Sequence, residues 1–364
     1  MTITETPTAA VTPSPARTIM GGRLATWVPW ALLGASALTA LLIFGVLSLA
    51  GDDGLNTGGM VVVAGLLYIV LIAVISTIVE GRRKATDRVV TGLVAGAFLI
   101  AMVPLISVAY TVISYGVARF DIMFFSSSMR NVVGEGGGAL HAIIGTLLVT
   151  LAAAIISIPI GLFTAIYLVE YGRGTMARGI TFLVDVMTGI PSIVAGLFAY
   201  ALFTIFFGQG IRLGIMGSVA LAVLVIPVVV RSSEEMLKLV PNELREASLA
   251  LGVPKWLTIV KVVLPTSLAG ITTGIMLSVS RVIGETAPLL ITAGFSASMN
   301  YNLFEGRMQT LPVFTYTQYA NQGIPAEAYL DRAWASALTL IIIVMLLNLI
   351  ARLIAKVFAP KTGR

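Results

Sequence analysis

The stretch Glu246-Ala247-Ser248-Leu249-Ala250-Leu251-Gly252 decides the fold of this chain, and a Leu264-Pro265 pair follows twelve residues after its glycine. The stretch lies in the longest polar segment between two apolar runs. Small and apolar residues recur here at i, i+3, i+4 and i+7, which places them on one face of a helix. That face comprises Leu244, Ala247, Ser248 and Leu251. The pattern predicts a short amphipathic helix between two membrane spans.

Residues with special backbone preferences mark both ends of this short helix. Pro241 interrupts the preceding polar helix, and Asn242 is a suitable N-cap for the new one. Gly252 suits the left-handed residue that ends a helix, and Pro254 suits the first position of the next helix. A short helix held between two turns fits insertion into the cleft of a partner. An ordinary amphipathic helix at the membrane interface is the alternative.

The composition is that of a polytopic membrane protein. Hydrophobic residues make up 57% of the 364 residues, charged residues make up 11%, and the mean hydropathy is +0.98, whereas soluble domains are about 25% charged. The chain has no cysteine, which excludes disulfides, thiolate metal sites and thiol catalysis. His141 is the single histidine, and no Gly-Lys-Ser/Thr run is present to bind ATP phosphates. We therefore expect a chain that is not an enzyme and holds no metal, with His141 an interfacial residue without chemistry.

Apolar runs predict about eight transmembrane helices and so an all-α membrane fold. Each run meets or approaches the ~20 residues needed to cross the hydrocarbon core. The runs cover residues 27–50, 59–80, 89–114, 139–169, 180–207, 213–231, 267–293 and 333–357. Residues 1–26 are rich in Thr, Pro and Ala, so we expect a disordered tail. The apolar run that follows is too long for a cleavable signal.

The distribution of basic residues predicts the orientation of the chain in the membrane. With both termini in the cytoplasm, 17 of the 23 Lys and Arg residues fall in inner segments. The outer segments hold Arg119, Arg130, Arg212, Arg307 and Arg332. This orientation puts Asp52-Asp53-Gly54 in an outer turn and the Glu246–Gly252 stretch inside. The net charge of +6 is thus a membrane-topology signal rather than a sign of nucleic-acid binding.

Two charges lie inside the seventh apolar run. Arg281 is about 20 Å from the start of the run at Leu268, counting 1.5 Å per residue, and each charge alone would cost roughly 2.5–3.5 kcal/mol to insert. In one continuous helix Arg281 and Glu285 are one turn apart and can neutralise each other. They either line a transport path or fix helix packing. A guanidinium matches phosphate oxygens, and a neighbouring carboxylate would help such a site to release its cargo.

Two small residues in the same run predict how its helix packs. Gly270 and Gly274 are four residues apart and form the kind of small-residue face that lets two helices approach closely. General looseness of a membrane helix explains the same glycines equally well.

The Glu246–Gly252 stretch resembles the EAA loop of ABC-importer permeases, whose pattern is Glu-Ala-Ala, three residues, Gly, nine residues, Ile, one residue and Leu-Pro. The matching residues are Glu246, Ala247, Gly252, Leu264 and Pro265. Ser248 replaces the second Ala and Val262 replaces Ile, and both keep the size or shape. The resemblance implies that the matching residues couple the chain to an ATPase subunit, on which ATP and Mg are bound, so that no cofactor is expected on this chain.

Three further segments are similar to the permease subunits of bacterial phosphate-specific ABC importers. They are Arg281-Val282-Ile283-Gly284-Glu285-Thr286-Ala287-Pro288-Leu289-Leu290, Gly189-Ile190-Pro191-Ser192-Ile193-Val194-Ala195-Gly196-Leu197 and Leu311-Pro312-Val313. The similarity implies a six-helix permease domain in residues 89–357, a two-helix extension in 27–88, and a cytoplasmic tail in 358–364. It also implies that Arg281 and Glu285 belong to the path of phosphate.

The same similarity implies the partners and the location of the chain. We expect a second permease subunit, an ATPase dimer and an extracytoplasmic phosphate-binding protein, all at a bacterial inner membrane. A permease for another oxyanion, sulfate or molybdate, is the nearest alternative. An ion-coupled secondary transporter would show internal halves with broken helices, and it leaves the polar loop unexplained. A structural scaffold is the weakest alternative, because it does not require Arg281 and Glu285.

Overall fold

A computed structural model describes residues 23–50 and 56–358, and within these ranges the chain is helical and contains no strand. Seven helices are long and apolar enough to cross a membrane, or eight if a sharply bent pair counts as one more span. The all-α membrane fold is therefore confirmed. The Asp52-Asp53-Gly54 turn, residues 359–364 and most of the expected N-terminal tail lie outside the described residues. The described residues form two compact units, with the division between Val108 and Ala109.

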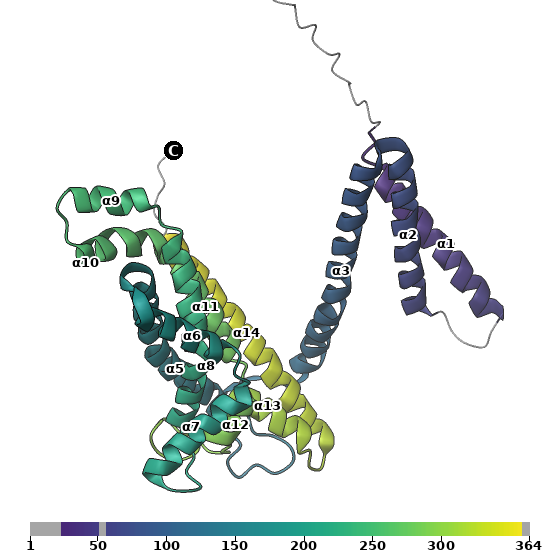
Figure 1. Cartoon of the computed structure of the whole chain (residues 1–364). Coiled ribbons are helices and arrows are strands. Elements are labelled where there is room, and N and C mark those ends of the chain that lie inside the picture. Colours follow the sequence, from purple (N-terminus) through teal and green to yellow (C-terminus); the bar gives the residue numbers. More distant parts are fainter. Residues whose placement is uncertain (1–22, 51–55, 359–364) are drawn as a thin grey trace, which may run out of the picture. The chain divides into compact units, whose positions relative to one another are not determined.

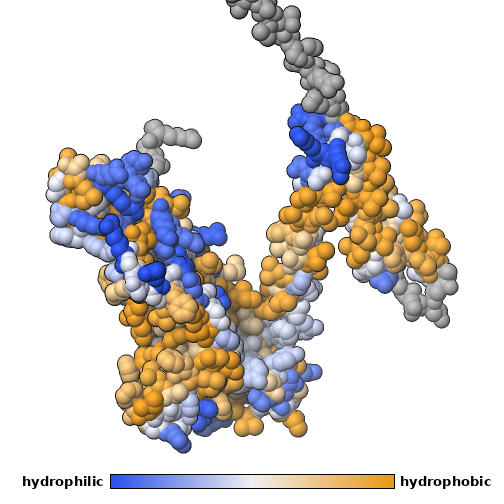
Figure 2. Space-filling view, in the orientation of Figure 1, coloured by the Kyte–Doolittle hydropathy of each residue, from blue (hydrophilic) through white to orange (hydrophobic). Residues whose placement is uncertain are grey.

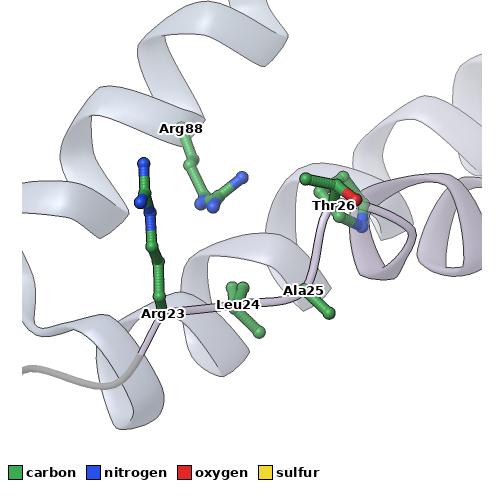
Figure 3. Close-up of a pocket in the computed structure, with 6 residues that line it drawn as sticks. Arg23, Leu24, Ala25, Thr26 and Arg88 are labelled. Carbon is green, nitrogen blue, oxygen red and sulfur yellow. The ribbon is translucent and has the colours of Figure 1, made fainter.

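The first unit is held at one corner by a buried carboxylate. It contains α1 (Val28–Ala50), α2 (Thr57–Glu80) and most of α3 (Arg82–Gly116), and α1 packs on α2. Glu80 accepts hydrogen bonds from Arg88 at 2.6 and 3.0 Å, from Ser76 Oγ at 2.9 Å and from the Leu24 amide at 2.9 Å. These bonds join the segment before α1 to the α2–α3 corner. A surface pocket beside this corner is lined by Arg23 and Arg88, among others (Figure 3).

The second unit is built around one buried helix, α8 (Gly214–Lys238), which packs against α5 (Leu140–Ile166) and α11 (Leu264–Val282). The long C-terminal helix α14 (Ala326–Phe358) packs on α11 (Figure 1). Branched aliphatic side chains fill the core between α5 and α8. They include Val149, Leu221, Val225 and Val229, each at most 1% exposed.

Shorter elements connect these long helices. They are η1 (Val117–Arg119), α4 (Ile122–Ser126), η2 (Tyr167–Tyr171), α6 (Gly174–Thr188), α7 (Ser192–Phe207), α9 (Asn242–Ala250), α10 (Lys255–Thr258), η3 (Ile259–Val263), α12 (Ala287–Thr292) and α13 (Leu311–Ala320). Both η2 and η3 are π-helical turns, a rare geometry that is frequent at functional sites. The η2 turn extends α5, and η3 joins α10 to α11.

Two of the eight expected helices are not continuous. The run 180–207 is two helices, α6 and α7, bent by 111° at Gly189-Ile190-Pro191. The run 267–293 is α11 and α12, separated by residues 283–286. The prediction of uninterrupted spans was wrong because a proline has no amide hydrogen to donate to the preceding turn, and its ring clashes with that turn. Pro191 and Pro288 therefore begin new helices instead of continuing old ones.

Three of the other apolar runs are helices that extend well beyond a predicted end. The helix expected at 89–114 begins at Arg82, the one expected at 213–231 continues to Lys238, and the one expected at 333–357 begins at Ala326. Polar residues continue a helix past its apolar part, which hydropathy cannot detect. The two compact units meet at residues 108 and 109, inside α3, whereas the domain boundary expected at residues 88 and 89 stays a prediction.

The close approach expected at the two glycines of α11 is confirmed. A methyl group added at Gly274 would lie 2.6 Å from Cβ of Ser232 in α8, and one added at Gly270 would lie 2.2 Å from Sδ of Met236. Both distances are shorter than contact, so α8 and α11 approach closely only because these positions lack side chains.

On the face of the second unit that Figure 2 shows, polar residues gather towards the two ends and apolar residues cover most of the middle. One end carries α9 and α10, and we call it the α9 end. The other end carries α7, α12 and α13 (Figure 1), and we call it the α12 end. An apolar belt between polar ends is the surface expected of a bundle that crosses a membrane.

Candidate functional sites: the α9 loop and the α11–α12 break

The helix predicted around the Glu246–Gly252 stretch is present as α9, residues Asn242–Ala250. Its N-cap is Pro241 rather than the expected Asn242, because the proline already has the extended backbone of a capping residue. Gly252 has φ +77° and its amide donates to Leu249 O at 2.9 Å, so the predicted left-handed end is confirmed. Nothing lies within 4 Å of a methyl group added there. The glycine is therefore required for its backbone conformation and not for space.

Arg245 fixes α9 to the helices behind it. Its Nε donates to Glu170 Oε1 at 2.9 Å, and its two terminal nitrogens donate to the carbonyls of Val240 at 2.6 Å and Leu237 at 2.9 Å. The side chains of Arg245 and Glu170 are 15% and 7% exposed. Glu170 lies in the π turn after α5, and Leu237 lies at the end of α8. One side chain therefore connects α9 to two long helices of the core.

A second set of contacts joins α9 and α10 to the same place. Ser248 Oγ lies 2.9 Å from Thr258 Oγ1, which links α9 to α10. Lys255 Nζ donates to the carbonyl of Glu170 and lies 4.8 Å from the ring centre of Tyr171. Lys255 is exposed and the bond between the two hydroxyls is uncharged, so we expect these contacts to add less to the stability of the α9 end than the ion pair of Glu170 does.

The opposite face of this loop presents large apolar side chains to solvent. Leu251 is 84% exposed and Trp256 is 61% exposed. Leu244 and Leu249 are also exposed, as are Glu246 and Ala247. Clustered exposed apolar side chains, rimmed by polar residues, are typical of a protein docking surface. The α9 loop thus has one face that is anchored to the bundle and one face that is open. Leu264 and Pro265 lie at the other end of η3, where α11 begins.

Arg281 and Glu285 lie on either side of the end of α11. Arg281 is in the last turn of the helix, which ends at Val282, and its side chain is exposed. Glu285 is half-buried in the connection to α12, with its amide bonded to Val282 O at 3.1 Å. No oxygen of Glu285 lies within 4.0 Å of a nitrogen of Arg281, and no other described residue pairs with either charge.

The expected pairing of these two charges on one helical face is therefore corrected. The i and i+4 geometry holds only in a continuous helix, and this helix stops before Glu285. Gly284 and Pro288 cause the break. A continuous helix would bond the amide of residue 288 to the carbonyl of Gly284, and Pro288 has no such amide. The two charges occupy the same region of the bundle but are not joined.

The break also brings α12 against α7 in a backbone contact. A methyl group added at Gly196 in α7 would lie 2.6 Å from the Cα of Pro288. Two of the three segments similar to phosphate permeases, 189–197 and 281–290, therefore meet in space. Their proximity could not be derived from the spacing of the two segments along the chain.

Sequence reasoning missed the anchoring residues of the α9 end. Glu170 and Arg245 are 75 residues apart, so no local pattern links them. Arg231 in α8 was counted only as a basic residue, but it pairs with Asp185 in α6 and with Glu234 Oε2 at 2.8 Å, and Lys238 Nζ lies 2.6 Å from Glu234 Oε1. The only available signal was the position of these carboxylates, which lie within an apolar run or directly after one.

His141 is buried within the second unit. It is 2% exposed, with Nε2 3.2 Å from Gln309 Oε1 and its ring packed edge-on against Phe314 at 5.3 Å between centres. The glycines before it form a loop that leads into α5, and the expectation that His141 lies at the membrane interface stays a prediction.

Comparison with known proteins agrees with this architecture. The family described as "Binding-protein-dependent transport system inner membrane component" matches residues 157–364. The "Phosphate transport system permease protein PstA" of Mycobacterium leprae is 46% identical over 284 residues, which cover 76% of this chain and 91% of that protein. The protein of the same description from Pasteurella multocida is 38% identical over 285 residues, 78% of this chain and 97% of that protein.

Among solved structures, a chain of the MetNI methionine ABC transporter in an inward-facing conformation superposes with a TM-score of 0.50. It is 21% identical, and the match covers 60% of this chain and 95% of that chain. This likeness bears on the fold alone.

Proposed function

Because the chain belongs to the binding-protein-dependent inner-membrane permeases, and within them to the PstA family, we propose that it is a permease subunit of a bacterial ATP-driven phosphate importer. The family itself makes the chain a multi-span transport subunit of an ABC importer. Our proposal adds the phosphate cargo, the coupling residues and the partners. The partners are a PstC-like second permease, a PstB-like ATPase dimer and a PstS-like phosphate-binding protein outside. ATP is hydrolysed on the partner dimer.

The observation that carries this proposal is the two-faced α9 loop. Its exposed leucines and Trp256 offer a docking surface for the ATPase, while Arg245 anchors the loop to α5 and α8. Closure of the ATPase dimer on ATP moves α9. The anchor then transmits that movement to two core helices as a rigid-body shift. Glu246, Ala247, Gly252, Leu264 and Pro265 belong to this coupling element because they match the family pattern.

Arg281 is the proposed phosphate contact in the translocation path. Its guanidinium has no partner among the described residues and lies in an otherwise apolar stretch. An unpaired charge at that depth is stable only next to water, an anion or another subunit. Glu285, close by but not joined to it, lowers the affinity of the region for a dianion and so favours release.

The cargo is tested by uptake into vesicles that contain the complete importer. We expect unlabelled phosphate to compete with radiolabelled phosphate, whereas sulfate and molybdate at the same concentration leave uptake unchanged. Competition by sulfate or molybdate at concentrations similar to phosphate would favour the oxyanion alternative. Purified importer without binding protein is the control for passive leakage.

The orientation is tested by reporter fusions. The distribution of basic residues supports a cytoplasmic α9 end, so a fusion after Arg364 is expected to report the cytoplasm and one within Asp52-Asp53-Gly54 the exterior. The opposite pattern would put the α9 loop on the side without ATP and would contradict the proposed coupling.

A further inference from the structure

Two arginines at the α12 end converge on one glycine. A methyl group added at Gly294 would lie 3.0 Å from Cδ of Arg212 and 3.6 Å from Cδ of Arg307. Gly294 is buried and has φ +73°, so neither the space nor the backbone there accepts another residue easily. The two side chains come from segments 95 residues apart in the chain. They meet directly after α12, which begins two residues beyond Glu285.

The backbone around this point is fixed by hydrogen bonds between three segments. The amide of Ile215 in α8 donates to Leu303 O at 2.8 Å, and the amide of Met308 donates to Ala293 O at 3.1 Å. Asn300 Nδ2 donates to the carbonyls of Glu305 at 2.7 Å and Arg307 at 3.0 Å. The two arginines are thus carried by an ordered framework and not by a loose loop.

The charges of the two arginines are not balanced by the protein. Among the described residues, no hydrogen bond or ion pair is made by the side chain of Arg212 or of Arg307. Arg307 lies over the ring of Phe295, with its Cζ 5.8 Å from the ring centre, which orients the guanidinium without neutralising it. Glu305, the nearest carboxylate along the chain, is within 3.4 Å of Asn302 Nδ2 instead. Two like charges held together without a counter-charge attract an anion.

We propose that Arg212 and Arg307 form a receiving site for a tetrahedral oxyanion at the α12 end, ahead of Arg281 in the path. The inference rests on the proposed function, which makes phosphate the oxyanion and the α12 end the outer one. Guanidinium forks match phosphate oxygens in pairs. Arg307 is exposed and Arg212 is half-buried, so the site leads inward from the rim. Because Arg212 is recessed, the site should bind a small anion better than a carboxylate on the surface of the binding protein.

The test uses the complete importer in vesicles and titrates the phosphate-loaded binding protein. The variants are Arg212→Gln, Arg307→Gln and the pair together, with Arg130→Gln as the matched control. Arg130 is also expected outside, and it is exposed and makes no ion pair with a described residue. We expect maximal uptake to fall about tenfold in each single variant, since each variant loses a charge-assisted hydrogen bond to the anion. The binding-protein concentration that gives half-maximal uptake should not change.

Three results would overturn the proposal. A rise in the half-saturating concentration of binding protein at unchanged maximal uptake would assign the arginines to docking of that protein. An equal loss in Arg130→Gln would assign the effect to general surface charge. Normal uptake in the double variant would remove the site altogether.

Two further variants distinguish loss of the site from misfolding. The same set of variants also separates failure of the receiving site from failure of the proposed function. Arg212→Lys and Arg307→Lys keep the charge and lose the fork, so they should recover part of the lost uptake while assembly stays normal. If the unmodified importer carries sulfate rather than phosphate, the proposed cargo fails, whereas the receiving site is still tested by the same variants with sulfate.

Discussion

The α9 loop contains Arg245, and the break between α11 and α12 follows Arg281. The two arginines differ in whether their donors are occupied by the protein. Arg245 donates to a buried carboxylate and two carbonyls, whereas Arg281 is exposed and makes no hydrogen bond or ion pair with a described residue. A side chain whose donors are occupied holds a helix in position. One whose donors are unoccupied is available to a ligand or a subunit. The contrast supports the proposed division of the chain into a coupling region and a transport region.

The largest effect is expected at the transport region. Arg281→Gln should abolish phosphate uptake while the importer still assembles, because the guanidinium is the proposed phosphate contact and makes no hydrogen bond or ion pair with another described residue. Glu285→Gln should reduce uptake less, since it removes a counter-charge and leaves the anion contact. Radiolabelled uptake and co-purification of the subunits measure the two outcomes. Exchanging the two residues sharpens the test. Recovery of activity in the exchanged protein would mean that only net charge in this region matters.

A nearly equal loss is expected from changes in the coupling region, but by a different route. Glu246→Lys reverses a charge on the exposed face, and Gly252→Pro forces a negative φ at a residue that has φ +77°. Both variants should insert normally and lose uptake, because they retain less of the ATPase subunit in co-purification. The control is Leu239→Lys, which changes an exposed position just before the loop. Unchanged assembly and uptake in both variants would contradict a coupling role.

A smaller effect is expected when the anchor behind α9 is removed. Arg245→Ala leaves Glu170 buried without its partner and should destabilise the α9 end by about 3–5 kcal/mol. Glu170→Gln should cost less because the amide still accepts a hydrogen bond. If the anchor transmits movement, uptake per ATP hydrolysed should fall in both variants while the ATPase subunit stays bound. Loss of ATPase binding in parallel with uptake would show instead that Arg245 only shapes the docking face.

The smallest effect is expected between α8 and α11, where both regions meet the same core. Gly274→Ala presses on Cβ of Ser232, which the backbone fixes, whereas Gly270→Ala presses on the end of Met236, which can move away. Overpacking of this kind costs about 1–3 kcal/mol, so we expect Gly274→Ala to lower the melting temperature of the purified importer more than Gly270→Ala does. Equal shifts would mean that α8 and α11 separate to admit either methyl group.

The α9 loop was predictable because its ends depend on local backbone chemistry. A proline before the helix and a left-handed glycine after it determine where α9 begins and ends, whatever surrounds it. The breaks before α7 and α12 were missed because hydropathy does not change across Pro191 or Pro288. The glycine and proline of each break were visible in the sequence, but the length of the apolar run outweighed them.

The partners of individual charges were not predictable. Arg245 and Glu170 are 75 residues apart, and Arg212 and Arg307 are brought near Gly294 only by the fold of two connections, the one before α8 and the one between α12 and α13. The local spacing of Arg281 and Glu285 predicted a pair that the helix break prevents. Spacing within an element thus predicts a shared face only where that element is continuous.

The most direct test of the separation between the two regions measures uptake, ATP hydrolysis and retained ATPase subunit together, in Arg281→Gln and Glu246→Lys importers supplied with loaded binding protein. The account predicts that Arg281→Gln keeps the ATPase subunit and its stimulated hydrolysis but loses uptake, and that Glu246→Lys loses all three in proportion. Normal uptake in Arg281→Gln, or loss of the ATPase subunit from it, would contradict the account.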